Sequence, residues 1–182
     1  MGKAIGMVEY KTVSAGVTAA DAMVKTAQVD IMEAQTVCPG KYIAVISGDL
    51  SAVNAAVETA KVQYGRHLIN SFVLGNPHAS IFPAIYGATE VEGVAALGIL
   101  ETYDASSIIV AADVAAKTAV VTLMELRIAR GMCGKSYLML TGEVAAVEAA
   151  IEKAKREIGA DGMYLDSTVI ANPDGKIWQA VL

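Results

Sequence analysis

Cysteine, proline and aromatic residues are all scarce in this chain of 182 residues, which contains 2 Cys, 4 Pro and only 5% aromatic residues. Two cysteines are too few for a disulfide framework, so a reducing compartment such as the cytoplasm is expected. No run of apolar residues approaches the ~18 that a membrane-spanning helix needs. Basic runs are also missing and the net charge is −5. Neither a membrane nor a nucleic acid is therefore the expected partner.

The common sequence motifs of enzyme active sites are missing as well. The glycines form neither a Gly-x-Gly-x-x-Gly nor a Walker pattern, and no Gly-x-Ser-x-Gly or His-Glu-x-x-His occurs. Glu9 and Glu101 recur in both halves of the chain, but no His or Asp recurs with them as a catalytic partner. His67 and His78 each lack a second ligand at metal-binding spacing. We predict that none of these four residues is catalytic and that the chain is not an enzyme.

What the chain does contain is the same sequence twice. Residues 4–33 recur at residues 96–125 with 13 of 30 positions identical, and residues 40–61 recur with 10 of 22 identical. The second copy gains two residues between these stretches. Two copies are too few for a solenoid, which needs at least three repeats to bury a continuous core. The duplication therefore predicts two domains, residues 1–92 and 93–182, in a pseudo-symmetric assembly.

The composition is unusually apolar for a chain with no membrane span. Apolar residues make up 54% of the chain and charged residues 18%, and the apolar share exceeds that of a typical soluble domain. Obligate subunit interfaces resemble a domain core cut in half. We attribute the surplus to contacts between subunits and expect an obligate homo-oligomer.

Hydrophobic periodicity and turn residues predict the order β-α-β-β-α-β in each copy, a ferredoxin-like α+β arrangement. Strands of the first copy are expected at residues 4–10, 29–37, 42–47 and 68–74, and helices at residues 19–28 and 50–64. Thr18 and Asp49 are the expected helix N-caps, and Gly65 is expected to end the second helix. In the second copy the helices are expected near residues 111–119 and 144–158. Residues 76–95 should join the copies and include one short helical turn.

The turn between the second and third strands of the first copy holds the main candidate site. Cys38 is followed by Pro39 and Gly40, a turn sequence from which a side chain can project. A Cys-Pro pair also closes the common bacterial iron–sulfur motif, although an inert thiol is an open alternative. One cysteine cannot hold a cluster, so any cluster requires copies of Cys38 brought together by symmetry. Cys133 lies in the matching loop, which is longer and carries Arg130, so the two thiols need not be equivalent.

Several segments resemble those of bacterial microcompartment shell proteins. They are Ala4-Ile5-Gly6-Met7-Val8-Glu9, Ala19-Ala20-Asp21-Ala22-Met23-Val24-Lys25, Gly48-Asp49-Leu50-Ser51-Ala52-Val53 and Asn76-Pro77-His78. A chain with two such domains resembles the tandem-domain class, in which three chains form a pseudohexameric tile of six domains. The segment Thr36-Val37-Cys38-Pro39-Gly40-Lys41 is similar to the iron–sulfur-carrying tandem shell proteins of propanediol-utilisation microcompartments.

The resemblance implies both a location and a cofactor. The expected location is the shell of a microcompartment in the cytoplasm. The expected cofactor is one [4Fe–4S] cluster per homotrimer, held on the three-fold axis by Cys38 of three subunits. Thr36, Val37, Pro39 and Gly40 would form the rest of the pore loop. Such a cluster would transfer electrons, or be transferred itself, across the shell, with a lumenal or cytosolic redox enzyme as a possible partner.

The resemblance also implies contacts with neighbouring tiles of other shell proteins. Lys25 and Lys117 occupy equivalent helix positions and are the expected edge residues. Asn76 and Asn172 stand where the family often has arginine, so edge contacts should differ in detail from those of other members.

Three alternatives remain open at this stage. The first is the same tile with an open central pore that passes small polar metabolites and carries no cluster. The second is a soluble trimeric small-molecule sensor of ferredoxin-like fold, which would need a pocket between domains. The third is a discrete electron-transfer enzyme, against which the missing cofactor and catalytic motifs argue.

Overall fold

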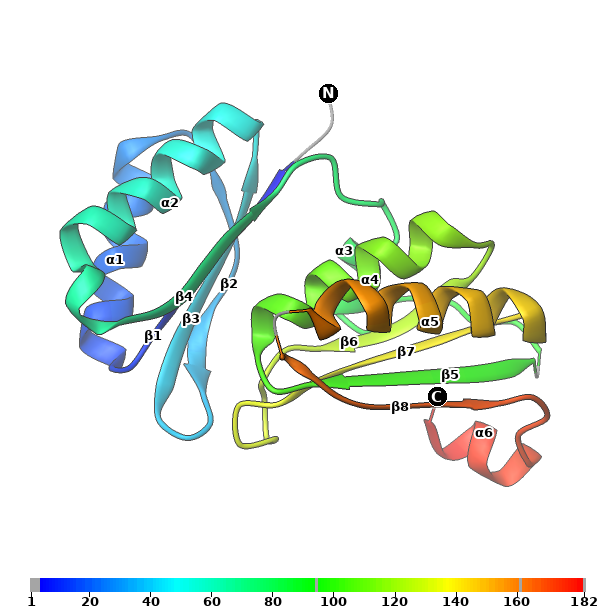
Figure 1. Ribbon diagram of the computed structural model, residues 1–182. Coiled ribbons are helices and arrows are strands. Elements are labelled where there is room, and N and C mark those ends of the chain that lie inside the picture. Colours follow the sequence, from blue (N-terminus) through cyan, green and yellow to red (C-terminus); the bar gives the residue numbers. More distant parts are fainter. Residues whose placement is uncertain (1–3, 94, 161, 182) are drawn as a thin grey trace. The chain divides into compact units, whose positions relative to one another are not determined.

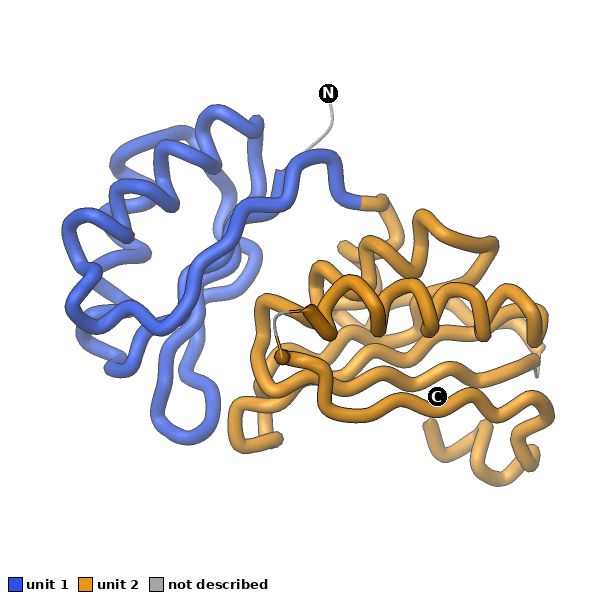
Figure 2. Tube along the Cα trace, viewed as in Figure 1, with its two compact units in different colours: residues 1–77 blue, residues 78–182 orange. Residues whose placement is uncertain are grey.

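A computed structural model describes residues 4–93, 95–160 and 162–181 of the chain. The chain divides into two compact units, Met1–Pro77 and His78–Leu182 (Figure 2). Each unit contains one four-stranded sheet in which all neighbouring strands are antiparallel. Two long helices cover one face of each sheet (Figure 1). The predicted α+β fold with two ferredoxin-like domains is confirmed.

The first unit has its sheet in the order β2-β3-β1-β4. Its elements are β1 (Ala4–Tyr10), α1 (Val13–Thr26), β2 (Asp30–Val37), β3 (Lys41–Gly48), α2 (Leu50–Tyr64), a 3-10 turn η1 (Gly65–His67) and β4 (Leu68–Leu74). The helices pack on the face that carries Val8, Tyr10 and Ile46, where they form one apolar core.

The second unit has the equivalent order β6-β7-β5-β8. It opens with a short helix, α3 (Ile81–Ile85), which fulfils the prediction of a helical turn in the joining segment. The remaining elements are β5 (Ala96–Thr102), α4 (Ala105–Thr118), β6 (Thr122–Arg127), β7 (Ser136–Gly142), α5 (Val144–Gly159), β8 (Tyr164–Ile170) and α6 (Gly175–Val181). Within this unit, α3 packs against β6 and α4. Residues 78–92 therefore lie in the second compact unit, although the sequence analysis assigned them to the first domain.

The repeated Ala-x-Gly opening of each copy allows a helix to approach the sheet closely. A Cβ atom on Gly6 would stand 2.6 Å from Val53 and 2.8 Å from Val57 of α2. A Cβ on Gly98 would stand 2.7 Å from Val147 of α5. Since real Cβ contacts are not this short, any larger residue would push the helix off the sheet.

The first helix of each copy begins earlier than predicted. Thr12, rather than Thr18, is the N-cap of α1, and its Oγ1 accepts a hydrogen bond from the backbone N–H of Ala15. Asp104 caps α4 in the same way. The prediction was wrong because Gly16 and several β-branched residues have weak helix propensity, which tertiary packing overrides here. Gly65 follows the last residue of α2 as expected, but its φ of −56° is right-handed and it begins the 3-10 turn.

Candidate functional site

The turn that joins β2 to β3 carries the candidate ligand. Its four residues, Val37 to Gly40, are closed by a hydrogen bond of 3.0 Å from Gly40 N–H to the carbonyl oxygen of Val37. The Cys38–Pro39 peptide bond is cis, and Gly40 has a φ of +90°, a conformation that glycine adopts at little cost. Val37 is buried, Cys38 is half-buried, and Pro39 and Gly40 are exposed. The turn thus presents a thiol near its tip.

An ion pair anchors the β3 side of this turn. Lys41 Nζ lies 3.0 Å from Oε1 of Glu9, whose side chain is fully buried. Oε2 of Glu9 is buried and has no hydrogen-bond partner among the described residues. A buried carboxylate is stable only when it is paired, so this contact ties the turn to the central strand β1. Glu9 therefore makes a polar contact with the first residue after the turn.

Cys38 is chemically suited to bind a metal but cannot do so as a single ligand. It is a free thiol, and thiolate sulfur is the usual ligand of iron–sulfur clusters. Within residues 4–93, 95–160 and 162–181 of one chain, no three His, Cys, Asp or Glu side chains come together in a group that could hold a metal. A cluster at this turn would thus need the same turn from further copies of the chain.

The matching loop of the second copy has a different backbone. It runs between β6 and β7, and Ala129, Gly131, Cys133 and Gly134 all have positive φ values. Ala129 is buried and its N–H donates to Oγ of Ser136 over 3.0 Å. Cys133 is a free and exposed thiol. The two cysteines therefore lie in loops of different length and different conformation, as the insertion of two residues suggested.

The two predicted edge lysines have equivalent partners but different surroundings. Lys25 pairs with Asp21 over 2.6 Å, and both side chains are largely exposed. Lys117 pairs with Asp113 over the same 2.6 Å, but the Asp113 side chain is only 7% exposed. Asp113 Oδ1 also accepts a 2.7 Å hydrogen bond from the backbone N–H of His78. Both ammonium groups remain partly accessible, and only the second pair is built into the fold.

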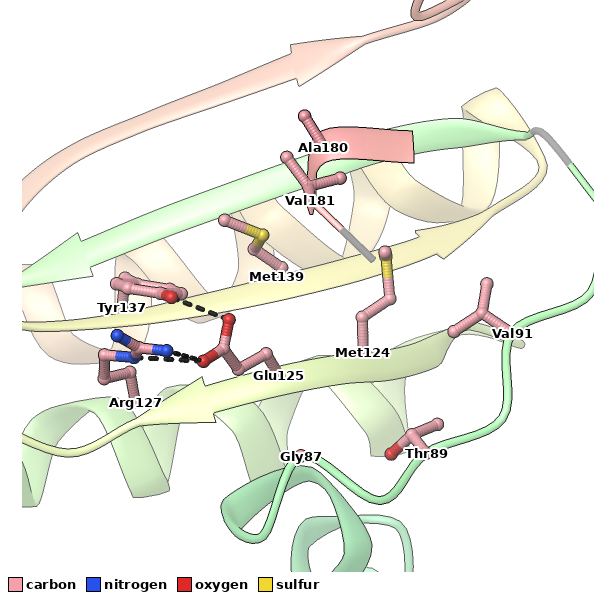
Figure 3. A pocket seen from close by; sticks show the side chains of 10 residues that line it. All are labelled: Gly87, Thr89, Val91, Met124, Glu125, Arg127, Tyr137, Met139, Ala180 and Val181. Atoms are coloured by element: carbon pink, nitrogen blue, oxygen red, sulfur yellow. Dashed lines mark hydrogen bonds and ion pairs between the residues drawn. The ribbon is translucent and has the colours of Figure 1, made fainter. Parts of the chain in front are cut away.

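A polar cluster that the sequence analysis missed lies in a cavity of about 420 Å³ in the second unit. Glu125 is at its centre and accepts hydrogen bonds from Arg127 and from the Tyr137 hydroxyl, the latter over 2.6 Å (Figure 3). Burial, followed by the hydrogen bond to Glu125, raises the pKa of Tyr137 to about 12. Glu125 also holds the pKa of Arg127 above its usual value. Tyr137 therefore stays neutral and Arg127 stays charged near neutral pH.

The rest of this cavity is mostly apolar. Met124 and Met139 of the sheet, Val91 of the joining segment and Val181 of α6 line it (Figure 3). The cluster could have been suspected from Glu125 and Arg127, because residues two apart on a strand point to the same face. Glu125 is held between Arg127 and the Tyr137 hydroxyl at the polar end of the cavity.

Comparisons with known proteins match both repeats to the same domain family. The pattern of the BMC domain matches residues 4–77 and again residues 96–173. The bacterial microcompartment shell protein PduT of Citrobacter freundii is 37% identical over 182 residues, which is 100% of this chain and 99% of that protein. The carboxysome shell protein CsoS1 of Prochlorococcus marinus is 34% identical over 88 residues, 47% of this chain and 85% of that protein.

Solved structures agree with these sequence matches. The crystal structure of a microcompartment protein from Desulfitobacterium hafniense DCB has a TM-score of 0.93 and 43% identity, and the match covers 98% of this chain and 99% of that one. The fused permuted hexameric shell protein MSM0275 from the RMM microcompartment has a TM-score of 0.65 and 20% identity, over 87% of this chain and 82% of that one. At 20% identity, the match to MSM0275 shows a similar fold and nothing more.

Proposed function

The chain belongs to the bacterial microcompartment shell-protein family, and on this premise we propose that three copies form one six-domain tile that holds a [4Fe–4S] cluster at its centre. The structural role in the shell follows from the family itself. The trimer, the cluster and its ligands are the proposal.

The duplicated architecture supports the trimer. A single-domain relative matches about half of this chain, so each chain carries two tile segments and three chains carry six. Each segment presents one turn between its second and third strands. Around a three-fold axis, the turn of the first unit would occur three times and so would the loop of the second unit.

The cluster is supported by the chemistry and exposure of the first turn. Cys38 is a free thiol, half-buried within one chain and next to the exposed Pro39 and Gly40. Three symmetry-related Cys38 thiolates could ligate three irons of a cubane, and metal binding itself would drive their deprotonation. If bound, the cluster would supply one-electron exchange, and three Cys38 thiolates would leave its fourth iron without a ligand from this turn. Thr36 and Val37 would hold the ends of the three turns.

The test is iron and sulfide analysis of anaerobically purified protein, combined with its absorption and paramagnetic resonance spectra. We expect one four-iron cluster for every three chains. Cys38→Ser should lose the iron and the brown colour but remain a trimer in light scattering, because cores and interfaces rather than the cluster hold the chains together. Cys133→Ser is the matched control and should keep both.

Three outcomes would overturn the proposal in different ways. Iron lost only in Cys133→Ser would assign the cluster to the other loop. An anaerobic wild-type trimer without iron would favour the same tile with an open pore for small metabolites. A stable folded monomer at micromolar concentration would contradict the trimer itself.

A further inference from the structure

The cavity of about 420 Å³ in the second unit has a polar end and an apolar end. At the polar end, Glu125 accepts two hydrogen bonds from Arg127, over 3.0 and 2.6 Å, and a third from the hydroxyl of Tyr137. The walls of the apolar end are Val91, Met124, Met139 and Val181 (Figure 3). Cavities of this size with apolar walls and a few convergent polar groups are typical of small-molecule sites.

A β-bulge directs the side chains of β6 into this cavity. The pairing of β6 with β7 shifts register between Leu123 and Glu125, which makes Met124 an extra residue on β6. Regular alternation would send neighbouring residues to opposite faces of the sheet. With the bulge, Met124, Glu125 and Arg127 all line the cavity. Bulges often re-aim side chains in this way next to functional sites.

The first repeat has the same bulge but a different polar group. Its strands β2 and β3 shift register next to Glu33. Gln35 stands at the position of Arg127, and its Nε2 donates to Oε2 of Glu33 over 2.6 Å. Ile43 stands at the position of Tyr137. The fold thus accepts a neutral residue beside the glutamate, so the fold alone does not require the arginine and tyrosine of the second unit.

The charges at the polar end cancel, and this balance selects the charge of a ligand. The carboxylate of Glu125 and the guanidinium of Arg127 form an ion pair of 2.6 Å, and their side chains are 26% and 46% exposed. Tyr137 is uncharged near neutral pH, because burial raises its pKa to about 12. An anion would be repelled by Glu125 and a cation by Arg127. A neutral head group with a hydrogen-bond donor avoids both repulsions.

Thr89 adds a second polar contact from the segment that follows α3. It lines the same cavity (Figure 3), and its Oγ1 is buried without a hydrogen-bond partner among the described residues. A buried hydroxyl that lacks a partner costs free energy, and most buried polar atoms in proteins are bonded. A head group that donates to Glu125 and accepts from Thr89 would satisfy both side chains.

We propose that this cavity binds a neutral amphipathic molecule, such as an alcohol or a primary amide with a short apolar chain. Its head group bonds Glu125 and Thr89, and its chain lies along the methionines of the sheet. Methionine side chains adapt to irregular shapes. Since a water molecule takes up about 30 Å³ of the liquid, the cavity holds roughly a dozen non-hydrogen atoms. The site lies within the second unit, and binding there requires neither the trimer nor the cluster.

Titration of the full chain, with its methionine methyl groups labelled for NMR, tests the site. Hexanamide, hexanoate and hexylammonium share one chain length and differ in the charge of the head group. At neutral pH, hexanamide should shift the methyl signals of Met124 and Met139 with a millimolar or lower dissociation constant. The two ions should bind at least about tenfold more weakly. Met7 and Met23 are fully buried in the first unit and serve as internal controls.

Two variants should reverse the charge preference. Arg127→Gln copies Gln35 of the first repeat and leaves the carboxylate unbalanced, so hexylammonium should become the tightest of the three compounds. Glu125→Gln leaves the guanidinium unbalanced, so hexanoate should become the tightest. Thr89→Val removes only the hydroxyl and should weaken hexanamide about threefold to tenfold. Glu58→Gln, at an exposed residue of α2, is the matched control and should leave all three affinities unchanged.

The fluorescence of Trp178, which packs with Met124, shows whether the second unit of each variant stays folded. If one charge variant unfolds, the other still tests the preference. Wild-type protein in which hexanamide shifts neither Met124 nor Met139 would overturn the site. Shifts of equal size at Met7 or Met23 would show non-specific partition into the protein and overturn it as well. An unchanged order of the three compounds in a folded charge variant would overturn the role of the ion pair in selecting a neutral ligand.

Discussion

The first and second domains of this chain fill equivalent positions in their cores with different pairs of side chains. Gly16 of α1 lies so close to the ring of Tyr42 that an added Cβ would stand 2.5 Å from it. The second domain has Ile108 and Ser136 at the same two positions, so a small–large pair has become a large–small pair. The exchange roughly conserves total volume, which protein cores tolerate best. The two domains thus kept one backbone while their cores diverged together.

The domains differ more on their surfaces and in their turns than in their cores. The α4–β6 surface of the second domain is covered by α3, whereas the equivalent surface of the first exposes apolar residues. The turns between the middle strands differ as well, since one is a four-residue turn with a thiol and the other a longer loop with several positive φ values. A duplication inside one chain permits this, because the two copies are separate stretches of sequence that can diverge independently. Identical subunits could not specialise in this way.

The largest effect is expected when the core pairs are exchanged one residue at a time. Gly16→Ile should lower the free energy of unfolding of the first domain by about 3 kcal/mol, since the side chain overlaps Tyr42. Adding Tyr42→Ser should recover most of this loss, as coupled neighbours do in a double-mutant cycle. Urea unfolding followed by circular dichroism measures both effects.

Trp178, the single tryptophan of the chain, reports on the second domain in the same samples. Its fluorescence transition should not move in either variant. The matched control is the reverse exchange, Ile108→Gly with Ser136→Tyr, in the second domain. If adding Tyr42→Ser does not recover the stability lost in Gly16→Ile, the side chains at positions 16 and 42 do not compete for one space. That result would contradict the exchange of small and large residues between the two cores.

A smaller difference is expected between the two lysines. Lys117→Ala should cost about 1–2 kcal/mol of stability, because it leaves the nearly buried Asp113 carboxylate with one donor fewer. Lys25→Ala should cost less than about 0.5 kcal/mol, the usual value of an exposed pair on a helix. Thermal unfolding of the two single variants measures the difference. Equal losses would mean that the burial of Asp113 has no energetic consequence.

The same lysines test the predicted edges of the tile. Replacing Lys25 and Lys117 together by Ala should weaken the assembly of trimers into sheets while light scattering still finds trimers. Electron microscopy of the sheets provides the measurement, with Lys61→Ala on α2 as the control. Sheets that form as readily without both lysines would contradict the edge assignment.

The smallest expected effect concerns alkaline pH. Burial, with a smaller contribution from Tyr64, raises the pKa of Tyr10 from 10.0 to about 12. As the pH rises, the unfolded chain therefore loses this proton before the folded chain does. The stability that Tyr10 contributes is complete below its unfolded pKa of 10.0 and is lost as the pH rises toward the folded pKa of about 12. Tyr10→Phe should cost about 1 kcal/mol at neutral pH, because its hydroxyl donates to the Ala60 carbonyl over 2.8 Å. Over the same alkaline range, the first domain of the Tyr10→Phe variant should lose less stability than that of the wild type.

Tyrosinate absorbance of the folded protein checks the assignment. Subtracting the titration of Tyr10→Phe from that of the wild type should leave one component with a midpoint near the pKa of about 12. Thr102 occupies the equivalent position in the second domain, and the subtraction removes the contribution of the other tyrosines, including Tyr137, whose pKa is also raised to about 12. A component that titrates at the ordinary tyrosine pKa would show that the hydroxyl of Tyr10 is not held in the core.

The sequence by itself determined the duplication, the order of elements, the bounds of α2 and β4 and the turn that carries Cys38. Repeats, hydrophobic alternation and turn residues are local sequence patterns. They set the backbone conformation of their own segment, and this conformation does not depend on residues far away in the sequence. The starts of α1 and α4 were decided by the tertiary structure, because packing on the sheet outweighs the weak helix propensity of Gly16 in α1 and of the β-branched residues in the first half of α4. The burial of Asp113 and the Glu125 cluster also depend on residues far apart in the sequence. Burial and ion pairing are properties of the assembled fold, and no local pattern records which copy of a repeated segment will be covered.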